Sequence, residues 1–68
     1  MKLSDIIKAT VTYGVEHWIG SGDDAYVDDV FMNTWEFRGT PMKLMNFVMG
    51  LVEDDYVDVT VKSIEKIA

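Results

Sequence analysis

Two short stretches of the chain hold enough carboxylates to suggest a divalent cation site. They comprise Asp23, Asp24, Asp28 and Asp29 in the first, and Glu53, Asp54, Asp55 and Asp58 in the second. Calcium and magnesium prefer oxygen ligands of this kind, but an EF-hand loop also needs a central glycine and a bidentate glutamate at fixed offsets. Neither stretch has both at those offsets, so the sequence predicts a solvated acidic face and no metal site.

His17 is the only histidine, and the chain has no cysteine. Nucleophilic catalysis or an imidazole metal site requires a serine, an aspartate or a second ligand positioned beside the histidine, and the sequence indicates no such neighbour. Paired carboxylates for glycoside hydrolysis would need a substrate cleft, which a domain this small rarely provides. We therefore expect a protein that is not an enzyme, with no catalytic residue and no cofactor.

The segment 20–25 reads Gly-Ser-Gly-Asp-Asp-Ala and formally matches a dinucleotide-binding fingerprint. That fingerprint needs a following helix whose N-terminus receives the pyrophosphate. Here a strand is expected next, and the two aspartates would repel the phosphates. The segment therefore predicts the turn of a β-hairpin.

The pattern Asp-x-Tyr-Val-Asp occurs twice, at 24–28 and at 54–58. In a strand, each copy directs its valine inward and a tyrosine flanked by two carboxylates outward. One interpretation is coincidence between two strand entrances whose acids protect a sheet edge. The other is an acidic, aromatic surface that binds a basic protein, such as one whose normal ligand is nucleic acid. This second interpretation gives the partner-binding role to Asp24, Tyr26, Asp28, Asp54, Tyr56 and Asp58.

The chain is acidic, with 12 Asp and Glu against 6 Lys and Arg and a net charge of −6. No lysine or arginine occurs from 9 to 37. Binding of nucleic acid or anionic lipid draws its affinity from basic side chains, so neither is expected as a direct ligand. The opening residues form neither the apolar core of a signal peptide nor a membrane span, and cysteine is absent, so we expect a cytoplasmic protein without a membrane segment.

A chain of 68 residues is expected to form one domain, 1–68, with one small core. Its first residues predict a helix of one or two turns, because Leu3, Ile6 and Ile7 have helical spacing and Ser4 can cap it. A strand is expected at 10–19, a hairpin turn at 20–24, and a second strand at 25–38 with a bulge or break at the aspartate pair 28–29.

Gly39-Thr40-Pro41 predicts the start of a second helix, with Thr40 as N-cap and Pro41 at the first helical position. This helix ends either near Met49, with Gly50 as its cap, or near Val52. Alternating valines from 57 to 61 predict a last strand.

The expected fold is therefore α+β, in the order αββαβ, with one amphipathic helix packed on a three-stranded, mainly antiparallel sheet. The position of the last strand in the sheet stays open. The sheet face expected under the helix carries Val11, Tyr13, Val15, Trp35, Phe37, Val57, Val59 and Val61.

The apolar arc of the second helix is wider than one sheet face usually covers. Leu44, Phe47, Val48 and Leu51 form the stripe expected to face the sheet, and Met42, Met45 and Met49 continue around one flank. Either the N-terminal segment and the tail at 64–67 cover these methionines, or they form the interface of a homodimer or of a complex with another protein. An interface would also help to stabilise a domain with so small a core.

The opening Met-Lys-Leu-Ser-Asp-Ile-Ile, the strand pair, the Gly-Thr-Pro before an apolar helix and the closing alternation of valines resemble small accessory proteins of phages and prophages. Some proteins of that kind inhibit host nucleases, restriction systems or CRISPR machinery as acidic mimics. The resemblance implies a protein-interaction domain that engages a basic host protein through electrostatic complementarity. The alternative hypothesis, drawn from the helix, is a self-associating structural or assembly module.

Overall fold

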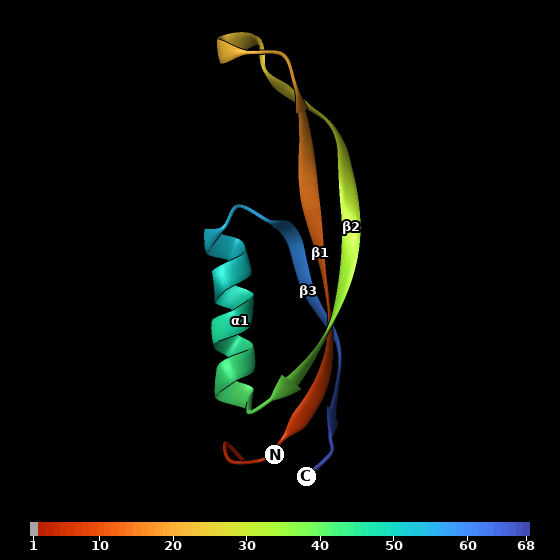
Figure 1. Ribbon diagram of the computed structural model, residues 1–68, viewed down its shortest axis with the longest axis vertical. Helices are drawn as coiled ribbons and strands as arrows, with labels where there is room; N and C mark the ends of the chain where they lie inside the picture. The colour runs from red at the N-terminus through yellow and green to blue at the C-terminus, as the bar shows by residue number, and fades with distance from the viewer. Residues whose placement is uncertain (1) are drawn as a thin grey trace.

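The computed structural model describes residues 2–68 and has the element order ββαβ (Figure 1). Its elements are β1 (Ile7–Ile19), a short 3₁₀ turn η1 (Gly22–Asp24), β2 (Tyr26–Gly39), α1 (Pro41–Glu53) and β3 (Val57–Lys66). The strands form one sheet in the order β2-β1-β3, and both pairings are antiparallel. The three-stranded antiparallel sheet and the single α-helix agree with the expected α+β class.

The predicted N-terminal helix is absent from residues 2–6, and this expectation was wrong. The Asp5 carboxylate instead accepts a hydrogen bond from the backbone N–H of Lys2 at 2.8 Å, and the Asp5 N–H donates to the Lys2 carbonyl at 3.1 Å, which closes a turn. Ile6 exchanges backbone hydrogen bonds with Ile67 and Ala68. Because the C-terminal segment offers a strand partner, the apolar residues at 6–7 extend the sheet, and β1 begins at Ile7 and not at residue 10.

The β1–β2 hairpin has the turn that the sequence predicts. Gly20 and Gly22 adopt positive φ angles of 93° and 58°, a region in which glycine carries no steric penalty. The register shifts between His17, which pairs with Asp29, and Trp18, which pairs with Val27. Asp28 is therefore the extra residue of a β-bulge, so the predicted irregularity at 28–29 is confirmed.

Helix α1 begins as expected and ends at the later of the two predicted positions. Thr40 is the N-cap, and its side-chain oxygen accepts a hydrogen bond from the Lys43 N–H at 3.4 Å. The helix continues through Gly50 to Glu53 and closes through the Asp54 N–H, which donates to the Gly50 carbonyl at 3.0 Å.

The core lies where α1 crosses the lower part of the sheet (Figure 1). Its buried side chains are Ile7, Ala9, Val11 and Leu44, and partly buried Phe37, Phe47, Val48, Leu51 and Val59 pack around them. The Phe47 ring stacks on Phe37 with centroids 5.7 Å apart and lies 6.3 Å from Trp35. These contacts confirm the predicted orientation of α1 toward the odd-numbered face of β1.

Four residues assigned to the covered face are exposed or lie elsewhere. Val15, Trp35 and Val61 remain 39%, 52% and 37% exposed, and Val57 lies on the opposite face, where its side chain approaches Gly14. A 13-residue helix is about 20 Å long, whereas a 13-residue strand reaches about 40 Å, so α1 cannot extend over the whole of β1. The predicted alternation in the last strand fails at Val57 because the β1–β3 register shifts between Thr12 and Gly14.

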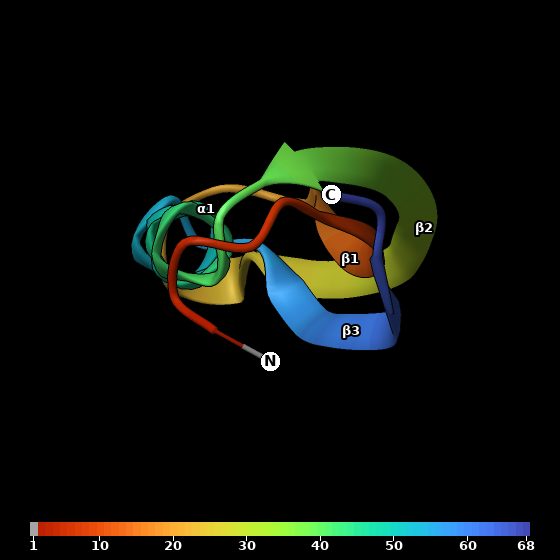
Figure 2. The same cartoon turned by 90° about the horizontal axis from the view of Figure 1, so that it is seen from below.

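The result is a strongly elongated molecule with extents of 49 × 17 × 12 Å. β3 begins opposite Gly14, so residues 15–31 form a two-stranded hairpin that projects beyond both β3 and α1; we call this hairpin the arm and the remainder the base (Figure 1). Viewed along the long axis, the strands curl around the helix side and the end of the hairpin lies behind α1 (Figure 2). The arm therefore bends over the same side of the sheet that α1 occupies.

Candidate protein-interaction surfaces

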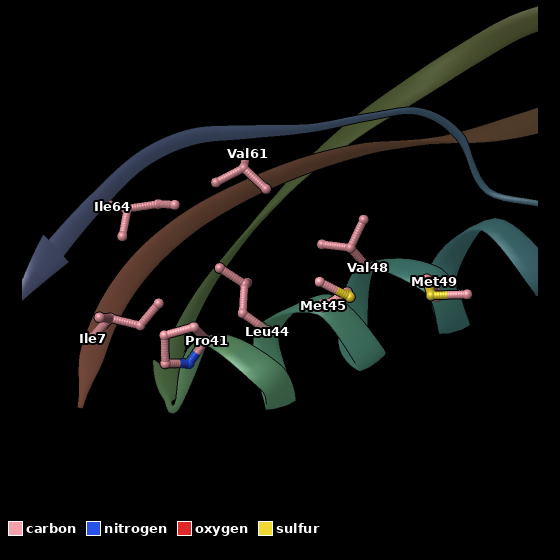
Figure 3. Close-up of a pocket in the computed structure, with 8 residues that line it drawn as sticks. All are labelled: Ile7, Pro41, Leu44, Met45, Val48, Met49, Val61 and Ile64. Atoms are coloured by element: carbon pink, nitrogen blue, oxygen red, sulfur yellow. The ribbon is translucent and has the colours of Figure 1, made fainter. Parts of the chain in front are cut away.

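An apolar groove separates α1 from β3 at the base (Figure 3). It has a volume of about 320 Å³ and is lined by Ile7, Pro41, Leu44, Met45, Val48, Met49, Val61 and Ile64. Every lining side chain is apolar, and Met45 and Ile64 at the rim are 60% and 49% exposed. Such a groove can accept apolar side chains, but it offers no side-chain hydrogen bond to orient a polar ligand.

A β-bulge places both strand residues of the groove on the helix side. Val61 and Ile64 are three apart, and in a regular strand they would point to opposite faces. The register of β3 shifts between Thr10 and Val11, so Val61 pairs with Val11 and Ile64 with Ala9, and both partners are buried on the α1 side. Sequence alternation predicted Val61 on this face, but a bulge leaves no signal in the hydrophobic pattern, and Ile64 was missed as a lining residue.

The methionines of the predicted oligomer interface are solvent-exposed. Met42, Met45 and Met49 are 53%, 60% and 54% exposed. Leu3 in the N-terminal segment is 71% exposed and Ile67 in the tail is 43% exposed, so these apolar side chains do not cover the methionines. Of the two interpretations of the wide apolar arc, burial by the chain's own ends is therefore not observed within residues 2–68.

The arm presents a second group of exposed apolar side chains. The exposed large hydrophobic residues of the arm are Val15, Trp18, Ile19, Tyr26 and Phe31. Val15 pairs with Phe31, which is 54% exposed, and both lie on the face of the sheet that α1 covers further down, beside 52% exposed Trp35. Sequence reasoning expected α1 to cover this face, so it did not identify the arm as an apolar surface.

The two Asp-x-Tyr-Val-Asp copies do not form one continuous surface. Tyr56 is half-buried and packs edge-on against Tyr13, with ring centroids 5.0 Å apart. Tyr26 is 57% exposed near the end of the arm, where it pairs with Ile19. Ile19 and Tyr13 are six residues apart along β1, a separation of about 20 Å.

The carboxylates of the two copies also differ in their surroundings. Asp24 lies in η1 at the arm's end, and the Asp28 carboxylate lies 2.9 Å from His17 Nδ1 within the bulge. Asp54 caps the end of α1, and Asp58 adopts a positive φ of 53° in β3. Within residues 2–68 no group of three or more potential metal-ligating side chains gathers.

Positive charge is confined to one part of the long axis, whereas carboxylates occur in both parts. All the lysines and arginines belong to the base: Lys2, Lys8, Arg38, Lys43, Lys62 and Lys66. The arm has no lysine or arginine and carries five carboxylates: Glu16, Asp23, Asp24, Asp28 and Asp29. The molecule therefore has an acidic arm and a base in which positive charge is concentrated.

Some of the basic charge is paired within the base. Glu36 accepts from Lys8 Nζ and from Arg38, each at 3.3 Å, and Lys66 Nζ lies 3.8 Å from Asp5. The hydrogen bond and charge of Lys8, followed by those of Arg38, hold the pKa of Glu36 below its ordinary value. Both pairs of Glu36 are exposed to solvent, so each stabilises the fold only slightly, whereas Asp5 is itself buried.

In residues 2–68 no helix is long and apolar enough to cross a membrane. Comparisons of the chain with protein-family models, with curated proteins and with solved structures find no match. The resemblance to phage and prophage accessory proteins therefore stays a prediction, and the function has to be argued from the surfaces described above.

Proposed function

We propose that the protein is a self-associating assembly module that acts as a homodimer through its exposed apolar surfaces. The observation that carries this proposal is that the chain exposes more surface than a compact monomer of its mass. The accessible surface is 5003 Å², whereas a compact monomer of 7.7 kDa exposes about 4,300 Å². The excess, about 700 Å², is close to the roughly 800 Å² that each partner buries in a standard protein interface.

The shape supports the same proposal. The radius of gyration is 15.1 Å, against about 11 Å for a compact chain of this length. A two-stranded hairpin is at best marginally stable in water, because it lacks a packed face. An arm with exposed Phe31 and Trp18 therefore gains stability when a second apolar surface covers it.

Sedimentation equilibrium and native mass spectrometry at micromolar concentration test this proposal. We expect a species of twice the chain mass. Its dissociation constant should change by no more than about threefold between about 0.05 M and 0.5 M salt, because salt does not screen the burial of apolar surface. Substituting Met45→Glu and Met49→Glu should shift the species toward monomer. A matched control, Lys62→Glu, adds negative charge to the base without placing it on the helix. A monomer at all concentrations contradicts the proposal.

A second function has support in the charge of the arm, which carries five carboxylates and no lysine or arginine. On this proposal the arm binds a basic partner protein by electrostatic complementarity, and Tyr26 is the exposed aromatic contact. Capture of a basic protein from a lysate should then weaken more than tenfold between about 0.05 M and 0.5 M salt.

Charge reversal separates the two copies of the repeated pattern in this test. The changes Asp24→Lys and Asp28→Lys should abolish salt-sensitive capture, whereas Asp54→Lys and Asp58→Lys should leave most of it, because the second copy lies outside the arm. Equal loss from both pairs would show that net charge alone is responsible. Unchanged capture after the substitutions in both pairs would rule out the arm as the binding site.

A further inference from the structure

We infer that two copies pack antiparallel, so that the arm of each lies over α1 of the other. This inference rests on the proposed homodimer and gives it a geometry. The contact is reciprocal, as a two-fold axis requires, because the same two surfaces meet twice. The axis passes near Gly14, the point at which β3 begins and the arm leaves the base.

The lengths of the two elements match. α1 has 13 residues and is about 20 Å long. From Gly14 to Ile19 and on into the turn, β1 extends about 20 Å beyond the point where β3 begins. Two copies related by the axis near Gly14 therefore place one arm along the whole length of the other copy's helix.

The exposed side chains match in character. α1 carries exposed Met42, Met45 and Met49, and of these Met45 and Met49 form its side of the groove beside β3. The arm carries Val15 and Phe31 on the face that bends toward the helix side (Figures 1 and 2). Phe31 pairs with Val15, the residue that follows Gly14. In the dimer Phe31 therefore contacts the last turns of the partner's helix near Met49. Methionine is suited to this contact because its flexible side chain adapts to aromatic rings.

The charges match as well. In the antiparallel arrangement the end of each arm, with Asp23 and Asp24, reaches the basic end of the other copy, where Lys2 and Lys43 lie near the start of α1. Attraction between these ends offsets the repulsion between two chains that each carry a net charge of −6. A parallel arrangement would place the two acidic arms side by side, so charge disfavours it.

Site-directed cross-linking tests this geometry, because the chain has no cysteine of its own. Phe31→Cys and Met49→Cys are made in separate chains, one of them isotopically labelled, and the mixture is treated with a short bismaleimide. The control replaces Phe31→Cys by Met32→Cys, the next residue of β2, which is equally exposed at 54% but lies on the opposite face of the sheet. Val15→Cys, on the neighbouring strand beside Phe31, serves as a second arm probe.

We expect mixed-mass cross-links from Met49→Cys with either arm probe, at least tenfold more than with Met32→Cys. Each variant is first shown by sedimentation to keep its oligomeric state. A dimer in which neither arm probe cross-links, or in which Met32→Cys cross-links equally, overturns the antiparallel geometry while leaving the proposed homodimer in place. A protein that is monomeric by sedimentation overturns both. Cross-links that form only between two Met49→Cys chains indicate helix-to-helix packing and also overturn the arm-over-helix contact.

Discussion

At Gly14 side chains from both neighbouring strands approach β1 so closely that an added side chain has no room. Gly14 is buried in β1, at the point where β3 begins. A methyl group added there would lie 2.6 Å from Val30 Cγ1, 3.0 Å from Val57 Cγ2 and 3.1 Å from Met32 Sδ. We therefore predict that Gly14→Ala destabilises the protein, although alanine is ordinarily better than glycine inside a strand.

The size of the effect follows from these neighbours. The Met32 thioether can rotate away, but both valines are β-branched and have restricted side-chain rotation, so relief requires the strands to shift. Overpacking of this kind costs about 1–3 kcal/mol, and the entropic advantage of alanine over glycine recovers about 0.5–1 kcal/mol. The expected net loss is about 1–2 kcal/mol in the free energy of unfolding, or a decrease of about 5–15 °C in Tm.

Urea and thermal unfolding, followed by circular dichroism, measure this difference. All samples are compared at one protein concentration, because the stability of a self-associating protein depends on it. The matched control is Gly50→Ala in α1, where an added methyl group meets nothing within 4 Å and should stabilise the protein by about 0.5–1 kcal/mol. The same substitution thus has opposite predicted signs at the two glycines. A Gly14→Ala protein as stable as the parent would refute the close approach of the three strands.

Three further predictions concern the base. Lys8→Met should raise the pKa of Glu36 in an NMR titration, because Lys8 is the main cause of its lowered pKa. The pairing with Lys8 stabilises the fold at pH values above the unfolded-state pKa of Glu36. This contribution disappears as the pH falls through the lower folded-state pKa. Leu44→Ala should remove about 2–5 kcal/mol, enough to unfold so small a domain in a thermal melt, since Leu44 is the buried helix residue of the core. Thr40→Ala should cost about 0.5–1 kcal/mol in urea unfolding, because its N-cap hydrogen bond to the Lys43 N–H is long at 3.4 Å.

The elements that the sequence predicted well are those whose signals are local. The cap and proline at 40–41 define where α1 begins, and the glycines at 20 and 22 define the hairpin turn. The prediction of an N-terminal helix was wrong because it rested on a local signal, whereas the segment that pairs with these residues is remote in the sequence. Ile6 pairs with the last two residues of the chain, and nothing in the first ten residues indicates that pairing.

The candidate site was predictable only in part. The excess apolar arc of α1 was visible in the spacing of its methionines, and the structure leaves those side chains exposed. The sequence did not reveal the arm, because a strand has the same alternating hydrophobic pattern whether a helix of its own chain or another molecule covers it. The repeat at 24–28 and 54–58 resembled one surface, but its copies lie about 20 Å apart along the sheet because one ends the hairpin and the other follows the helix.

Helix α1 is too short to cover the strand pair on which it packs. A strand pair with a half-buried pattern needs cover along its full length, and a single helix of 13 residues supplies about 20 Å of it against about 40 Å of strand. Residues 2–68 contain no second α-helix, so half of the patterned face has no helix over it within the molecule. A second copy offers a helix of the required length that itself carries exposed apolar side chains. The surplus of strand over helix and the surplus of apolar arc on the helix therefore have one common explanation, in which each copy covers what the other leaves exposed.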